Sequence, residues 1–101
     1  MEDQSTMNLI RKAFRKRVGS QIEVAQAKLE TMKAKAEAAS ARAALAAIVA
    51  LLNEKSSIDR TVDELREAGH SGYQQLKADI EARVAQLEQS VQAIESKFKA
   101  A

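Results

Sequence analysis

The sequence predicts an all-α protein, and its composition supplies the first reasons. Of its 101 residues 20 are alanine, only three are aromatic and none is proline. Alanine is the best helix former, whereas β-strands favour β-branched and aromatic residues. Apolar residues also recur at steps of three and four along most of the chain, which is the period of one helix face. We therefore expect one helical domain over residues 1–101: an antiparallel hairpin or coiled coil with a short basic helix before it, or alternatively a three-helix bundle.

The first expected element is a basic amphipathic helix over residues 6–18. Its apolar face consists of Met7, Ile10, Phe14 and Val18, which follow one another at helical spacing. Five cations occupy the rest of its surface: Arg11, Lys12, Arg15, Lys16 and Arg17. The formal charge of the whole chain is only +2. Residues 1–19 carry five basic and two acidic residues, whereas basic and acidic residues nearly balance in the rest of the chain, so the excess positive charge lies in the first segment.

This basic helix has three possible binding roles and one purely structural one. An apolar face beside several cations is typical of a helix that docks on anionic lipid, and the same cations suit an acidic protein partner. Non-specific contact with nucleic-acid phosphates is a less favoured alternative. The simplest alternative is that the apolar face packs on the rest of the chain while the cations only keep it in solution.

The second expected element is a long alanine-rich helix over residues 20–68. Gly19 is followed by Ser20 and Glu23, which have the spacing of a capping box, so either a new helix starts at Ser20 or one helix continues through a weak position. Residues 53–57 allow a bend. Apolar positions at heptad-like steps form a face suited to self-association: Ile22, Leu29, Met32, Ala36, Ala39 and Ala43. The C-terminal helix is too short to cover the start of this face, so we expect the first helix or a second copy of the chain to cover it, with a homodimer favoured.

A turn over residues 69–72 and a C-terminal helix over residues 72–99 complete the expected fold. Gly69 is expected to end the long helix in the left-handed conformation. A tight turn places the two helices side by side and antiparallel, with the numbers of facing residues adding to about 140. Apolar residues at steps of three and four run through the last helix: Tyr73, Leu76, Ile80, Val84, Leu87, Val91, Ile94 and Phe98.

Catalytic and metal chemistry are not indicated. The chain has no cysteine and one histidine, His70, in the expected turn, and its three glycines do not form a phosphate-binding loop. The adjacent carboxylates Asp63 and Glu64 point in different directions on a helix. We therefore expect a non-enzymatic protein without cofactor or metal. The longest apolar run, residues 43–52, is too short to cross a bilayer, which needs about 20 residues, so we expect a cytoplasmic protein that is at most membrane-peripheral.

The C-terminal part of the chain resembles a known family. The segment Leu65-Arg66-Glu67-Ala68, the following glycine turn and the segment Gly72-Tyr73-Gln74-Gln75-Leu76-Lys77-Ala78 are similar to small bacterial coiled-coil proteins of stress response, including high-light stress in cyanobacteria. The resemblance covers mainly residues 60–101, and Tyr73 and Val84 stand where that family often has tryptophan. It implies a helical hairpin that acts by self-assembly and by helix-mediated contacts with other proteins, without catalytic residues.

Overall fold

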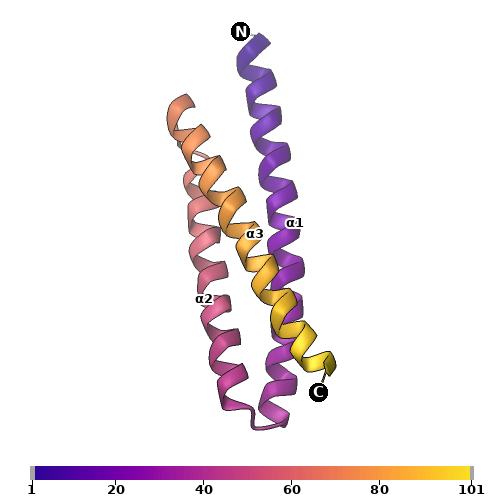
Figure 1. Ribbon diagram of the computed structural model, residues 1–101. Coiled ribbons are helices and arrows are strands. Elements are labelled where there is room, and N and C mark those ends of the chain that lie inside the picture. Colours follow the sequence, from indigo (N-terminus) through magenta and orange to yellow (C-terminus); the bar gives the residue numbers. More distant parts are fainter. Residues whose placement is uncertain (1, 101) are drawn as a thin grey trace.

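The chain folds into a three-helix bundle. The computed structural model describes the backbone of residues 2–100 and the side chains of residues 6–69 and 71–99. Within residues 2–100 it contains the helices α1 (Glu2–Ala38), α2 (Arg42–Glu64) and α3 (His70–Ala100) and no strand (Figure 1). The bundle is elongated, with extents of 57 × 17 × 16 Å. The predicted all-α class is confirmed, in the form of the three-helix alternative.

Helix α1 is a single helix of 37 residues, so the prediction of a separate basic helix over residues 6–18 is wrong and the alternative of one helix through Gly19 is confirmed. The helix continues through Gly19, and Ser20 does not start a new one. The reason is packing: Val18 and Ile22 lie on one buried face on either side of the glycine. A glycine inside a helix costs about 1 kcal/mol, whereas each large apolar side chain that becomes buried contributes about 1.5–3 kcal/mol.

Helices α1 and α2 are separated by a tight connection at residues 39–41, which contradicts the long helix predicted over residues 20–68. Ser40 adopts a left-handed backbone conformation with φ of 54°. The N–H of Ala41 donates to the carbonyl of Ala36 over 2.9 Å, and the N–H of Ser40 donates to Glu37 over 3.2 Å. This pair of bonds is the Schellman motif that commonly ends helices. Helix α2 continues through residues 53–57, where the sequence allows a bend, without a break.

The second connection also differs from the prediction. Helix α2 ends at Glu64, residues 65–67 form a turn, and α3 begins at His70, so the connection lies before the predicted turn at residues 69–72. None of the glycines has a positive φ, and Gly69 instead accepts a hydrogen bond of 2.8 Å from the N–H of Tyr73 in the first turn of α3. The side chain of His70, the only histidine, lies outside the described residues.

Each helix runs antiparallel to the one before it, and the core lies between the three helices. Helices α2 and α3 are antiparallel in the predicted register, since Arg83 donates to Ser57 over 2.7 Å and these numbers add to 140. Helix α3 runs parallel to α1, and the rings of Phe14 and Tyr73 meet edge to face with centroids 6.4 Å apart. The largest fully buried side chains come from all three helices and the turn after α2: Val18, Leu29, Ile48, Ile58, Leu65, Ile80 and Leu87. The first turns of α1 extend beyond the connection between α2 and α3 (Figure 1).

Candidate functional site

The strongest candidate site is the part of α1 over residues 6–18, called the basic end below. The predicted apolar face divides there into two halves. Phe14 and Val18 are buried in the bundle, whereas Met7 is half-buried and Ile10 keeps 53% of its surface exposed. Ile10 belongs to the same predicted face, yet the other two helices leave more than half of its surface uncovered. The predicted face is therefore partly a packing surface and partly a free one.

One of the five predicted contact cations, Arg11, is engaged inside the molecule. Its Nη1 donates to the carbonyl of Ala68 over 2.9 Å, and its guanidinium lies 4.4 Å from the ring centroid of Tyr73. The hydrogen bond and the cation–π contact together attach α1 to the connection between α2 and α3. Arg11 thus has a structural role, and the same two contacts hold its guanidinium beside the connection between α2 and α3.

A second cation, Arg17, makes weaker contacts on the other flank of the buried face. Its Nη2 lies 3.9 Å from Oε2 of Glu81, and its guanidinium is 5.4 Å from the ring centroid of Phe14. Both members of the ion pair keep at least half of their side-chain surface exposed, and exposed pairs of this kind contribute about 0–1 kcal/mol. Arg17 therefore remains available to an external anion.

The remaining three cations, Lys12, Arg15 and Lys16, form no ion pair with any side chain that the structure describes. Lys12 and Lys16 are exposed and Arg15 is half-buried.

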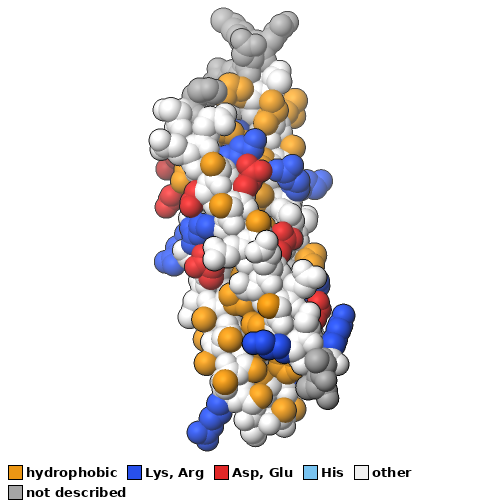
Figure 2. Space-filling view, in the orientation of Figure 1, with side chains coloured by type: hydrophobic (Ala, Val, Ile, Leu, Met, Phe, Trp, Pro, Cys, Tyr) orange, Lys and Arg blue, Asp and Glu red, His pale blue; other side chains and the backbone are white. Residues whose placement is uncertain are grey.

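Exposed apolar residues accompany these cations. Leu9 keeps 68% of its surface exposed, and Ala13 is exposed as well. Residues three and four apart share one side of a helix, so these side chains form one surface, which we call the docking face: Leu9, Ile10, Lys12, Ala13 and Lys16. Figure 2 shows hydrophobic and basic side chains next to one another near this end of the molecule.

A basic groove borders the docking face. It is an open depression of about 570 Å³ between α1 and the turn that follows α2, lined by Asn8, Arg11, Lys12, Arg15, Leu65 and Arg66. Sequence reasoning identifies three of its four cations but misses Arg66. That residue lies about 50 positions further along the chain, and only the fold of the second connection brings it to α1.

The predicted self-association face is mostly internal. Ile22, Leu29, Met32 and Ala36 are all at most 4% exposed, because α2 and α3 cover them. Its last two members, Ala39 and Ala43, are exposed at and after the first connection. The prediction of self-association depends on an uncovered face, and in this fold the chain covers that face itself. The oligomeric state stays a prediction.

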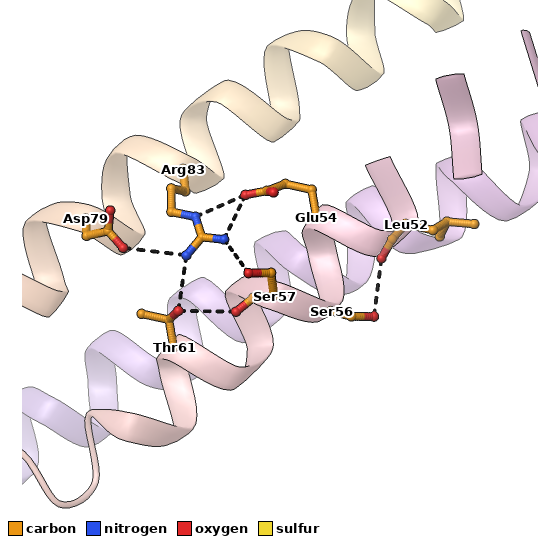
Figure 3. A network of polar contacts seen from close by, with 7 residues as sticks. All are labelled: Leu52, Glu54, Ser56, Ser57, Thr61, Asp79 and Arg83. Atoms are coloured by element: carbon orange, nitrogen blue, oxygen red, sulfur yellow. Dashed lines mark hydrogen bonds and ion pairs between the residues drawn. The ribbon is translucent and has the colours of Figure 1, made fainter. Parts of the chain in front are cut away.

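A separate polar cluster surrounds Arg83 in the middle of the bundle (Figure 3). Its Nε and Nη2 donate to Oε1 of Glu54 over 3.0 and 2.9 Å, and its two terminal nitrogens donate to Ser57 and Thr61 over 2.7 and 3.1 Å. Asp79 lies 3.6 Å from Nη1. The hydrogen bond to Glu54 raises the pKa of Arg83 above its already high ordinary value, against the opposing effect of burial, so the guanidinium stays charged. The cluster joins α3 to α2, and the N–H groups of Arg83 that could bind a ligand already donate to residues of α2.

The described residues offer no group of three His, Asp or Glu side chains that could hold a metal ion. Among the described helices, none combines the length and the apolar character that crossing a membrane requires. No family model, no curated protein and no solved structure matches the chain significantly. The resemblance to stress-response coiled-coil proteins therefore stays a prediction, and the function is inferred from the site itself.

Proposed function

We propose that the protein is a peripheral membrane-binding module that docks the basic end of α1 on an anionic lipid surface. The observation that carries this proposal is the pair Leu9 and Ile10. Among the side chains that the structure describes, four large apolar ones are exposed, and the other two, Val24 and Val49, stand singly on different helices. Leu9 and Ile10 instead follow each other in α1, and exposed Ala13, four and three residues further along, joins them into one apolar strip among the cations of the basic end.

The two kinds of side chain suit the two layers of a membrane surface. Lys12 and Lys16 on the docking face, with Arg17 at its edge, would gain about 1 kcal/mol each near an anionic leaflet. Leu9 and Ile10 would enter the headgroup region, where complete burial of such a side chain contributes about 1.5–3 kcal/mol. Only two side chains insert, so this attachment is reversible and depends on the lipid charge.

A lipid surface fits the docking face better than a folded acidic protein does. A stable protein interface needs about 800 Å² on each partner and close shape complementarity. The docking face offers two large apolar side chains on a convex helix, which is far less than such an interface requires. A fluid surface needs no matching shape, because its headgroups rearrange around the helix. Self-assembly of the stress-response type is the second candidate function, and its support remains the resemblance in sequence.

Vesicle co-sedimentation of the full chain tests the proposal. We expect the chain to bind phosphatidylcholine vesicles that contain phosphatidylserine and not vesicles of phosphatidylcholine alone. The double variant Leu9→Gln, Ile10→Gln should bind at least about tenfold more weakly, because about 1.4 kcal/mol of lost insertion corresponds to that factor. High salt should weaken binding of the natural chain, since the cations are exposed.

The matched control is the double variant Val24→Gln, Val49→Gln, which removes the other two exposed large apolar side chains that the structure describes, both away from the basic end. It should bind as the natural chain does. The proposal fails if the natural chain does not bind the phosphatidylserine vesicles, or if the two double variants lose binding equally. Circular dichroism of all three chains confirms that the helices are intact.

A further inference from the structure

The basic groove brings four cations from two separate parts of the chain to one depression. Arg11, Lys12 and Arg15 come from consecutive turns of α1, and Arg66 comes from the turn after α2. Of the residues whose side chains the structure describes, neither an Asp nor a Glu lines the groove. In the part of the chain that the structure describes, Lys12, Arg15 and Arg66 have no ion pair. Like charges held together without counter-charges repel one another, and a bound anion removes that repulsion.

We infer that this groove binds a compact anion that carries at least two phosphate groups. Three of the four cations are arginines, and a guanidinium presents a planar fork of donors that matches phosphate oxygens. A single phosphate has too few charges and oxygens to engage four cations, whereas a chain or ring with several phosphates has enough. The volume of about 570 Å³ accommodates a ligand of that size.

The lining also restricts the kind of ligand. Leu65 is the one apolar side chain among the described residues that line the groove, and Asn8 adds an amide that can donate to a phosphate oxygen. Among the side chains that the structure describes, none that lines the groove is aromatic, so this lining offers no stacking surface for a base. Arg11 is already held by Ala68 and by the ring of Tyr73, so part of the site is ordered before any ligand arrives. Less conformational freedom is then lost on binding.

The inference does not rest on membrane docking, because the groove and the docking face use different sides of α1. Lys12 lies at the border between them, whereas Arg66 belongs only to the groove and Leu9 only to the docking face. A variant of Arg66 therefore tests the groove alone, and a variant of Leu9 and Ile10 tests the docking face alone.

Isothermal titration calorimetry of the full chain with inorganic tripolyphosphate tests the inference. We expect one saturable site per chain at low salt. Arg66→Gln and Arg15→Gln should each lower the affinity about tenfold or more, the loss expected when one charge-assisted contact to a phosphate is removed. The matched control is Arg60→Gln, an exposed arginine of α2 outside the groove, which should change the affinity less than about twofold.

Two results would overturn the inference. One is the absence of saturable binding to the natural chain, and the other is an equal loss of affinity in Arg66→Gln and Arg60→Gln, which would indicate diffuse attraction to net charge. Arg66 is exposed, so its variant should keep the fold, and a thermal melt followed by circular dichroism verifies this.

A second arm identifies the source of the phosphates. Vesicles that contain phosphatidylinositol bisphosphate are compared with phosphatidylserine vesicles of the same total charge. Tighter binding to the former, lost in Arg66→Gln, assigns the groove to a phosphorylated lipid headgroup. Equal binding to both vesicles, with tripolyphosphate binding retained, assigns it to a soluble polyphosphate. Either result leaves tripolyphosphate binding of the Leu9→Gln, Ile10→Gln variant unchanged, which separates the groove from the proposed docking.

Discussion

Arg83 is the side chain that holds the middle of α3 against α2, since it contacts Glu54, Ser57 and Thr61 at once. We expect Arg83→Met to lower the free energy of unfolding by about 1–2 kcal/mol, because charged hydrogen bonds are lost at a partly exposed site. Arg83→Lys should recover little of this loss, since an ammonium cannot reproduce the fork of donors. Urea denaturation measures both values. Arg60→Met, at an exposed position, should change stability by less than about 0.5 kcal/mol, and equal effects at the two positions would contradict the role of Arg83.

Gly19 is a second single residue with a clear expected effect. It lies inside α1, and a Cβ built there meets nothing within 4 Å. Gly19→Ala should therefore raise the free energy of unfolding by about 0.5–1 kcal/mol, because alanine favours the helix and restricts the unfolded chain. Thermal denaturation followed by circular dichroism measures the change. A lower melting temperature would show that α1 is interrupted at this position.

At the scale of elements, the connection between α1 and α2 depends on a serine where glycine is usual. Ser40 has a positive φ, which costs a residue with a side chain more than it costs glycine. Ser40→Gly should raise the free energy of unfolding, measured by urea denaturation, by about 0.5 kcal/mol, even though glycine also increases the freedom of the unfolded chain. Ser96→Gly, at an exposed position inside α3, should lower it by about as much or more. If both substitutions destabilise the protein, the left-handed conformation at Ser40 does not form.

The sequence predicts the elements unevenly, and the reasons are physical. The pairing of α2 with α3 follows from the apolar period and a short connection, and the contact between Arg83 and Ser57 confirms the register. The capping signal at Ser20 is local, and the continuous burial of Val18 and Ile22 outweighs it. The connection at residues 39–41 has no glycine and no proline, so nothing local marks it. The alanine-rich segment around it has the composition of a close-contact surface, yet most of its alanines are exposed.

The candidate site is predictable only as far as it lies within one stretch of α1. Helical spacing identifies the five cations and the apolar face without any structure. It cannot show that Arg11 points inward to Ala68, that Phe14 and Val18 are buried while Ile10 is not, or that Arg66 joins the groove. Those properties depend on how α3 and the connection before it pack against α1, which the sequence of α1 alone does not contain.

At the scale of the whole molecule, the bundle covers the face that the sequence assigns to a second copy of the chain. Leu29 and Ala36 are fully buried within one chain, so a dimer formed through that face would have to open the bundle. We therefore expect sedimentation equilibrium at micromolar concentration to give the mass of a single chain, about 11.0 kDa. A stable dimer that Ala43→Glu disrupts, while a variant of exposed Ala78 on α3 does not, would instead restore self-assembly as the leading function.

The central claim is that one end of this bundle docks on anionic lipid, and a single fluorescent probe tests it most directly. The chain has no tryptophan, so Leu9→Trp introduces a unique reporter on the docking face, and Val49→Trp introduces a matched one on α2. With phosphatidylserine vesicles, the emission of the Leu9→Trp chain should shift to shorter wavelength as the indole leaves water, while that of the Val49→Trp chain should not. Equal shifts in both variants, or no shift in the Leu9→Trp chain, would contradict the account.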